Sequence, residues 1–443
     1  MFKKSFSITL ILILISACSF DNKSGIWKNT NETSKIDDNV FKDFKTLKIK
    51  NKIFEDTIQI PSNFKFNISK PVNNSNWNDI FYNKSNNFDH FTYENKNELL
   101  FKSKKISSNE IDNFILFKNE NIISSDLKGN IIIFSLAEKK VIHKFNFYKK
   151  KFKKLKKKLN MIVENNIIYI SDNIGYLYAY DFVTNKVLWA KNYEIPFRSN
   201  LKLGQNYLIV ANQNNSLFFF NKLDGKLLKL IPTEETLAKN KFINNISLTN
   251  DSILFLNTFG SLYSIDKKRL NINWFININE SQELSLSNIF FGNEIINYNG
   301  KIIVSSNQNI YVIDSKTGLI LFSKNFSPII KPFINNDYLF LITKNNLIIS
   351  INLKNKKIIY SYNINQKIAD FLNTKKKTVK FKSIFIANKE ILIFLKNSYV
   401  LNFGVRGELK SINKLPTKIK TNPIFIDGSV LYLDQKNRVS IVN

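Results

Sequence analysis

The feature that most constrains the fold is a short motif that recurs along the chain with a mean spacing of about 44 residues. The clearest copies are residues 175–181 (GYLYAYD), 260–266 (GSLYSID) and 308–314 (QNIYVID). The last residue of each aligned copy falls at 135, 181, 221, 266, 314, 352, 403 and 443. A repeat of this length is typical of β-propeller blades. Eight copies therefore predict an all-β fold, an eight-bladed β-propeller of four-stranded antiparallel blades.

The local composition favours the same fold. The apolar runs are short, rich in β-branched and aromatic residues and separated by turn residues, and none shows sustained helical periodicity. Only 12 of the 443 residues are glycine, although tight turns need positive φ. Asn is the residue that best tolerates the left-handed conformation after Gly. We therefore expect Asn185 and Asn355 to occupy such positions.

The C-terminus lies inside the last predicted blade, at residues 438–443. An earlier segment must then supply the outer strand of that blade. Residues 99–106 have the right apolar character and directly precede the first complete blade. Since each blade alone would expose an apolar face, the ring is stable only when it closes.

Three clear copies of the motif end in an aspartate: Asp181, Asp266 and Asp314. The eighth residue after each one is aromatic: Trp189, Trp274 and Phe322. Catalytic carboxylates are one interpretation of the aspartates. Their fixed place before a polar turn instead predicts that they accept hydrogen bonds from nearby backbone N–H groups.

The N-terminus has the features of an export signal. Lys3 and Lys4 precede a short apolar stretch, residues 6–15, which is too short to span a bilayer of about 30 Å. The signal ends in residues 15–18 (ISAC), which resemble the lipobox of bacterial lipoproteins. This resemblance implies cleavage after residue 17 and attachment of lipid to Cys18, which would anchor the protein to a membrane. The alternative is an ordinary secretory signal with an incidental cysteine.

Cys18 is the only cysteine, so the exported chain has no internal disulfide. Residues 18–76 are polar and weakly patterned, which indicates a lipidated tether with one ordered strand at 52–61. We expect three parts: a lipoprotein signal peptide (1–17), the tether (18–76) and the propeller (77–443).

The formal net charge is +30, which would normally suggest a nucleic-acid partner. Only four of the 65 basic residues are arginine, however, and phosphate or base recognition favours the guanidinium group. Abundant Lys, Asn and Ile indicate an AT-rich coding sequence, so we expect no nucleic-acid partner. The densest run, residues 149–158 (KKKFKKLKKK), is either a contact to a membrane surface or lipopolysaccharide, or a solvated loop.

The sequence lacks recognisable catalytic or metal-binding motifs. His90 and His143 are the only histidines, and neither has ligand-type residues at metal-binding spacing. No G-x-S-x-G, Walker A or H-E-x-x-H motif is present. We therefore expect no catalytic residue, no metal site and no cofactor.

The repeats resemble those of quinoprotein-type (PQQ-like) propellers, and the whole chain resembles the BamB family of outer-membrane β-barrel assembly lipoproteins. The resemblance covers the lipobox, the tether and the region from Trp77 onward. Residues 76–77 and 86–90 resemble a degraded form of the family segment that precedes the first blade, and residues 257–263 resemble a family stretch ending in Gly-Glu-Leu-Tyr. Most family glycines and several blade tryptophans are missing.

This resemblance implies a non-enzymatic scaffold on the outer membrane, facing the periplasm. Such a protein docks on the periplasmic domains of the barrel-inserting protein and aids delivery of unfolded outer-membrane protein substrates. Quinoprotein enzymes hold PQQ above a disulfide between adjacent cysteines, with calcium nearby, and this chain has no such pair. Two alternatives stay open: a degenerate PQQ-binding enzyme or ligand-binding propeller, and a lipoprotein that binds glycans or anionic lipid.

Phe197 and Arg198 are the candidate partner-binding residues. An aromatic side chain beside one of only four arginines, on a loop stiffened by Pro196, has the composition of an interaction hot spot. The family resemblance implies that this connection contacts the barrel-inserting protein. The alternative is that Phe197 packs into the next blade and Arg198 is incidental.

Overall fold

The computed structural model describes residues 18–20, 27–29, 54–235, 242–279 and 290–443. The chain divides into two compact units, Met1–Lys52 and Ile53–Asn443. In the first unit, strands β1 (Cys18–Phe20) and β2 (Trp27–Asn29) pair antiparallel. The predicted signal peptide, residues 1–17, lies outside the described residues. Within the described ranges, no helix is long and apolar enough to cross a membrane.

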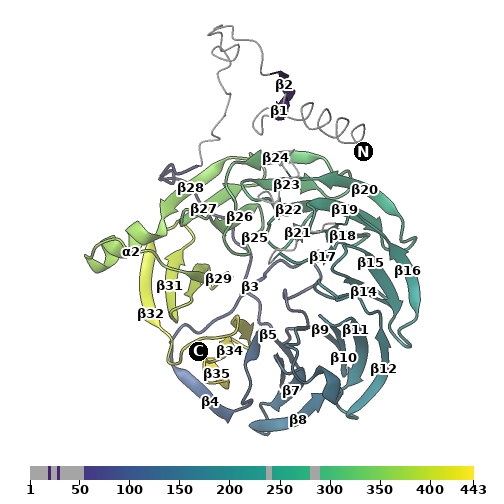
Figure 1. Cartoon of the computed structure of the whole chain (residues 1–443). Helices are drawn as coiled ribbons and strands as arrows, with labels where there is room; N and C mark the ends of the chain where they lie inside the picture. The colour runs from purple at the N-terminus through teal and green to yellow at the C-terminus, as the bar shows by residue number, and fades with distance from the viewer. Residues whose placement is uncertain (1–17, 21–26, 30–53, 236–241, 280–289) are drawn as a thin grey trace, which may run out of the picture. The chain divides into compact units, whose positions relative to one another are not determined.

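Residues 54–443 form a ring of eight blades, which confirms the predicted fold (Figure 1). In the described part of this unit, each blade is an antiparallel sheet of four strands, and one blade carries a fifth strand on its inner edge. We number the blades in chain order and give their strands from the axis outward.

The first four blades contain these strands: β5 (Ile111–Lys118), β6 (Asn121–Asp126), β7 (Asn130–Ser135) and β8 (Lys140–Asn146); β9 (Leu159–Glu164), β10 (Ile167–Asp172), β11 (Tyr176–Asp181) and β12 (Lys186–Asn192); β13 (Lys202–Leu203), β14 (Tyr207–Ala211), β15 (Leu217–Asn221) and β16 (Leu227–Ile231); β17 (Asn245–Leu248), β18 (Ser252–Leu256), β19 (Ser261–Asp266) and β20 (Ile272–Asn277).

The last four blades contain these strands: β21 (Ile296–Tyr298), β22 (Lys301–Ser305), β23 (Ile310–Asp314) and β24 (Ile320–Lys324); β25 (Phe333–Asn335), β26 (Tyr338–Ile342), β27 (Leu347–Asn352) and β28 (Ile358–Asn363); β29 (Phe381–Ala387), β30 (Glu390–Leu395), β31 (Tyr399–Gly404) and β32 (Leu409–Lys414); β33 (Ile424–Ile426), β34 (Ser429–Leu433), β35 (Arg438–Val442) and β4 (Leu99–Lys105). Outside the blades are β3 (His90–Phe91), the 3-10 helix η1 (Lys150–Phe152) and helix α2 (Ile364–Leu372).

The middle strands of each blade are continuous apolar runs because both of their faces pack against neighbouring blades. In β6, β7 and β18, for example, every residue but the first is buried. The outer strands are more exposed, as in β12 and β16. Trp189, on the outer strand β12 of the second blade, packs on Gly225 in a turn of the third blade. The contact is so close that a Cβ added to Gly225 would lie 2.5 Å from the Trp189 ring.

The ring closes as the sequence predicts. Strand β4, near the start of the unit, pairs antiparallel with β35, the last strand of the chain, and forms the outer edge of the eighth blade. Pairs such as Phe101 with Ile441 join residues more than three hundred positions apart.

The turns follow most of the predicted chemistry. The side chains of Asp181, Asp266 and Asp314 each accept hydrogen bonds from two backbone N–H groups in the following turn, which confirms their structural role. Asn accounts for 13 of the 22 positive-φ residues other than Gly in the described ranges, Asn185 among them. The prediction for Asn355 was wrong: the left-handed residue of that turn is Lys356. In the seventh blade the sequence alignment placed the end of the motif at residue 403. In the structure the residue that pairs with the first residue of β30 is Gly404, so the motif ends one residue later than aligned.

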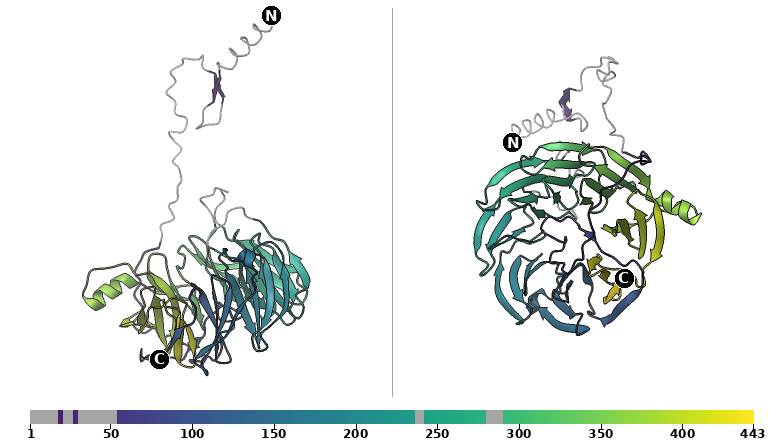
Figure 2. Two further views of the ribbon diagram at one scale, coloured as in Figure 1. Left: turned by 60° about the horizontal axis from the view of Figure 1, so that its bottom comes forward. Right: turned by 180° about the vertical axis from the view of Figure 1, so that it is seen from behind.

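Each blade is an antiparallel meander, so its turns fall on two faces of the ring. The inter-blade face carries the turn between second and third strands and the connections from one blade to the next, such as residues 193–201 and 325–332. The hairpin face carries the remaining turns. Helix α2 belongs to the connection between the sixth and seventh blades and projects from the rim (Figures 1 and 2).

Residues 54–76, which we expected in the tether, pack on the propeller. The ring of Phe54 lies 5.3 Å from that of Phe326, and Ile58 pairs with Ser361 of β28. On the hairpin face the guanidinium of Arg406 donates hydrogen bonds to the backbone carbonyls of Pro61 and Ser62, both at 3.2 Å, and of Phe64. The propeller unit therefore begins more than twenty residues before the expected boundary at 77.

Candidate functional site

The centre of the ring is occupied by the chain's own residues 74–94, which we call the axial segment. It comes in from the hairpin face, where Asn74 and Glu94 contact the first turn of the eighth blade. Strand β3, within this segment, pairs in parallel with β29 and makes the seventh blade five-stranded (Figure 1).

The axial segment contacts the innermost strand of every blade. Its contacts to the first four blades are Trp77 N–H to the Phe117 carbonyl (2.8 Å), the Asn78 carbonyl to Val163 N–H (2.9 Å), the Asp79 carboxylate to Lys202 (2.5 Å) and the Lys84 carbonyl to Leu248 N–H (2.8 Å). Its contacts to the last four are the Ser85 carbonyl to Asn297 N–H (3.0 Å), the Asn87 side chain to Ile334 N–H (2.8 Å), β3 to β29, and the Asn74 side chain to the Phe425 carbonyl (2.8 Å).

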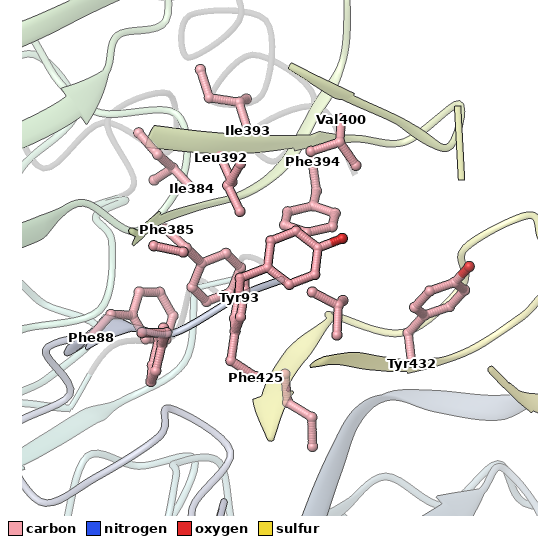
Figure 3. Close-up of a cluster of buried hydrophobic side chains, with 14 of the residues drawn as sticks. Phe88, Tyr93, Ile384, Phe385, Leu392, Ile393, Phe394, Val400, Phe425 and Tyr432 are labelled. Carbon is pink, nitrogen blue, oxygen red and sulfur yellow. The ribbon is translucent and has the colours of Figure 1, made fainter. Parts of the chain in front are cut away.

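Aromatic side chains of the axial segment complete the core between blades. Phe88 lies 4.5 Å from Phe385, and Phe91 stacks on Phe425 at 5.0 Å. Figure 3 shows Phe88 and Tyr93 packed against side chains of the seventh and eighth blades. A segment held by every blade and buried among them is part of the fold and not a loosely seated peptide.

Two lysines, Lys202 and the half-buried Lys331, hold the axial segment by its polar groups. Lys202 has no exposed surface, and its ammonium group donates to the Asp79 carboxylate (2.5 Å), the Asn83 carbonyl (2.7 Å) and the Asn86 side chain (2.5 Å). Burial lowers the pKa of Lys202, and Asp79 opposes that shift. Lys331 donates to the carbonyls of Phe81 (3.1 Å) and Asn86 (2.9 Å).

His90 is buried, and both of its ring nitrogens have partners. Its Nδ1 lies 2.6 Å from the Ser69 carbonyl, and its Nε2 accepts a hydrogen bond from Lys389 N–H at 2.7 Å. These partners require the neutral ring with the proton on Nδ1, and burial lowers the pKa of His90 accordingly. His143 lies far from it, on the outer strand β8.

The residues present do not fit PQQ with calcium. No two cysteines are adjacent, because Cys18 is the only one. Within the described residues, no three His, Cys, Asp or Glu side chains gather as a metal site. The axial segment also occupies much of the middle of the ring and leaves a cavity of about 210 Å³ there.

The loop between the second and third blades holds Phe197 and Arg198. Phe197 is 2% exposed, pairs with Asn212 and packs edge-on against Tyr193 (5.9 Å) and Phe218 (6.1 Å). Its ring therefore orders the loop and offers no surface to a partner. Arg198 is half-buried, and its guanidinium donates to the Phe242 carbonyl at 3.0 Å. Glu194 and Ile195 are exposed beside it.

The lysine-rich run 149–158 lies on the same inter-blade face, between the first and second blades. Lys157 is 2% exposed and donates to the Phe152 carbonyl at 2.5 Å, so it has a structural role. Six others are exposed: Lys149, Lys150, Lys153, Lys154, Lys156 and Lys158.

The outer strand of the third blade carries three exposed leucines. In β16, Leu227, Leu228 and Leu230 are 47%, 50% and 43% exposed. Since β16 is the last strand of its sheet, its outer backbone groups have no partner strand in the described residues.

Sequence reasoning missed the axial segment. Trp77 and residues 86–90 stood out only through their family resemblance, and nothing local predicts that they thread the ring. The one physical signal was a cluster of aromatic and Asn residues with no strand alternation, placed directly before the first blade.

Comparison with known proteins adds the family. Residues 118–362 match the sequence family described as outer membrane protein assembly factor BamB. No curated protein sequence matches the chain. Among solved structures, BamB from Moraxella catarrhalis superposes with a TM-score of 0.61 at 12% identity, covering 77% of this chain and 99% of that one.

Two further structures share the fold. The computationally designed protein Ika8 has a TM-score of 0.57 at 10% identity, over 78% of this chain and 99% of its own. Quinohemoprotein alcohol dehydrogenase from Comamonas testosteroni has a TM-score of 0.60 at 9% identity, over 84% of this chain and 81% of its own. At these identities the structural matches show the fold alone.

Proposed function

The chain belongs to the family of outer membrane protein assembly factor BamB, and from this premise we propose that it is a non-enzymatic scaffold subunit of the outer-membrane β-barrel assembly machinery. It docks on the periplasmic domains of the barrel-inserting protein and aids delivery of unfolded outer-membrane proteins. The match over residues 118–362, more than half of the chain, is the observation that carries the proposal.

The axial segment supports a scaffold rather than an enzyme. A propeller enzyme of the quinoprotein type needs room at the axis for its cofactor. Here Trp77, Phe88 and Phe91 occupy much of the axis, pack on one another and on rings of the seventh and eighth blades, and leave a cavity of only about 210 Å³. The same contacts make the ring stiff, which suits a protein that presents fixed loops to a partner.

The docking surface in this proposal is the loop at residues 193–199. The buried Phe197 fixes the loop, and the half-buried guanidinium of Arg198 is the group that contacts the partner. An arginine held by a backbone carbonyl loses little conformational entropy on binding, which is typical of hot-spot residues.

Substrate delivery is assigned to the blade edges. The exposed leucines and unpaired backbone of β16 offer a strand edge with which an unfolded β-strand can pair. This edge belongs to the third blade, and the loop with Arg198 leads into that blade, so a substrate strand on β16 would lie beside the docked partner.

The anchor in this proposal is lipid on Cys18, after removal of residues 1–17, which holds the protein on the outer membrane facing the periplasm. Residues 19–52 lie between the anchor and the propeller unit. No nucleic acid takes part.

Charge reversal at Arg198 tests the docking surface. Arg198→Glu is expected to reduce co-purification of the barrel-inserting protein by about tenfold or more, because a charge-assisted contact becomes repulsive. Arg269→Glu is the matched control, since Arg269 is an exposed arginine in a turn on the hairpin face. Melting temperatures of both variants are measured to show that they fold.

Two results would contradict this assignment. One is wild-type recovery of the partner with a folded Arg198→Glu protein. The other is an equal loss with Arg269→Glu, which would indicate a general effect of charge and not a docked loop.

A further inference from the structure

A cavity of about 210 Å³ lies on the axis, where the apex of the axial segment approaches the inter-blade face. Its floor is aromatic, formed by Trp77, Phe81 and Phe88. Five blades form its walls: the first, fifth, sixth, seventh and eighth. Each contributes residues of its inner strand or residues just before that strand. Figure 3 shows Phe88, Ile384 and Phe385, three of the apolar lining residues, close together.

Polar groups line one side of this cavity. Lys382 and Ser383 come from β29, and Lys331 from the residues before β25. Ser383 is only 9% exposed, and its hydroxyl oxygen is buried and has no hydrogen-bond partner among the residues that the structure describes. A buried hydroxyl without a partner is destabilising, so a ligand that supplies one gains affinity.

The charge of the cavity is positive. Lys331 and Lys382 both line it, against one carboxylate, Glu294. The Lys331 ammonium lies 3.4 Å from the centre of the Phe88 ring and is already held by two carbonyls of the axial segment. Among the described residues Lys382 has one hydrogen bond, 2.6 Å to the Lys420 carbonyl, and it can offer its remaining protons to a ligand.

We propose that this cavity binds a small apolar or aromatic carboxylate, with the carboxylate on Lys382 and Ser383 and the apolar group on the aromatic floor. A dry apolar cavity of about 150 Å³ is enough to bind benzene, so a cavity of about 210 Å³ holds an aromatic ring with a short acidic arm. The carboxylate can belong to a free small acid or to the C-terminus of a polypeptide.

Titration of the two amines supports this assignment. Burial lowers the pKa of Lys331 to about 7. The positive charge of Lys202 lowers this pKa further, and the carboxylates of Glu294 and Asp79 oppose the shift. Burial, with a smaller contribution from Lys396, lowers the pKa of Lys382 to about 8. Both amines are charged below these values, so affinity for a carboxylate is highest below pH 7 and falls as the pH rises through 7 and 8.

The experiment uses the full mature chain carrying Cys18→Ser, so that neither lipid nor detergent competes for the cavity. Calorimetric titration with phenylacetate is expected to give a Kd of about 0.1–1 mM. Phenylacetamide, which has the same shape and no charge, is expected to bind about tenfold more weakly. Lys382→Met should cost about tenfold in the Kd for phenylacetate, and Ser383→Ala about threefold to tenfold.

Lys380→Met is the matched control, because Lys380 is exposed two residues before Lys382. It should leave the affinity unchanged. Lys331 is left intact because it also holds the axial segment. No binding of phenylacetate at millimolar concentration, equal binding of acid and amide, or wild-type affinity in folded Lys382→Met would each overturn the proposal.

A second pair of probes separates the two sources of the carboxylate. N-acetyl-Ala-Phe with a free C-terminus is compared with its C-terminal amide and with phenylacetate. Tighter binding of the free peptide than of phenylacetate assigns the cavity to polypeptide C-termini, and the reverse assigns it to small acids. The loop with Arg198 takes no part, so either outcome is independent of the docking test.

Discussion

At the scale of single residues, the side chain of Lys202 shows how the axis of the ring is held. A charged group taken out of water costs several kcal/mol unless partners replace the lost hydration. Lys202 has three such partners, all on the axial segment, with Asp79 carrying the opposite charge. The pair therefore couples the third blade to a segment more than a hundred residues earlier.

Removing this ammonium should destabilise the propeller strongly. Lys202→Met leaves the Asp79 carboxylate buried without its partner, and we expect a loss of about 3–5 kcal/mol in the free energy of unfolding. Lys354→Met, which breaks the exposed pair of Lys354 with Asp337, should cost about 1 kcal/mol or less. Urea denaturation measures both. Similar losses in the two variants would show that the buried pair is not the structural link described here.

At the scale of elements, two pairings make a ring out of eight sheets. Strand β4 completes the eighth blade beside β35, and β3 lines the inner edge of the seventh. Both belong to the N-terminal part of the unit and pair with strands near the C-terminus. Because these contacts are non-local, their loss exposes apolar faces on neighbouring blades at once.

Truncation at either end separates closure from tethering. Deletion of Gln435–Asn443 removes β35, with Val439 and Val442 fully buried, and leaves β4 without a partner strand. We expect this protein to aggregate or to melt about 10 °C or more below the wild type. Deletion of residues 19–50, which precede the propeller unit, should leave the melting temperature nearly unchanged. Equal damage from the two deletions in a thermal melt would contradict these boundaries.

At the scale of the whole molecule, the proposed activities are spread around one rigid ring. The loop with Arg198 lies between the second and third blades, and the apolar edge of β16 belongs to the third. The axial cavity is lined by the other side of the ring, from the fifth blade round to the first. A partner, a substrate strand and a small acid therefore use different residues.

Membrane attachment is the prediction at this scale. Cys18→Ala removes the only thiol of the chain, and with it the proposed site of lipidation. We expect the variant to move from the membrane fraction to the soluble fraction while its melting temperature stays the same. Immunoblots of the two fractions, after a high-salt wash that removes partner-mediated attachment, give the measurement. A variant still retained on washed membranes would exclude the lipid anchor.

Much of the fold followed from the sequence alone because a blade is a local object. The apolar runs and turn residues of one blade all lie within a repeat of about 44 residues. The eight blades, the turn role of Asp181 and the closing pair of β4 with β35 could therefore be predicted from the sequence. The candidate loop was found in the same way, from the composition around Arg198.

Only the tertiary structure decided what fills the axis and which side chains reach a surface. Residues 74–94 make their contacts with every blade in turn, at separations that no local pattern encodes, and the lysines that hold them look like the other lysines in the sequence. Burial of Phe197 was equally undetermined, since an aromatic beside an arginine has the same composition in a core as on a surface. Short-range sequence patterns specify the blades. The residues that occupy the axis, the cavity beside them and the exposed face of each loop are specified only by the non-local packing of the closed ring.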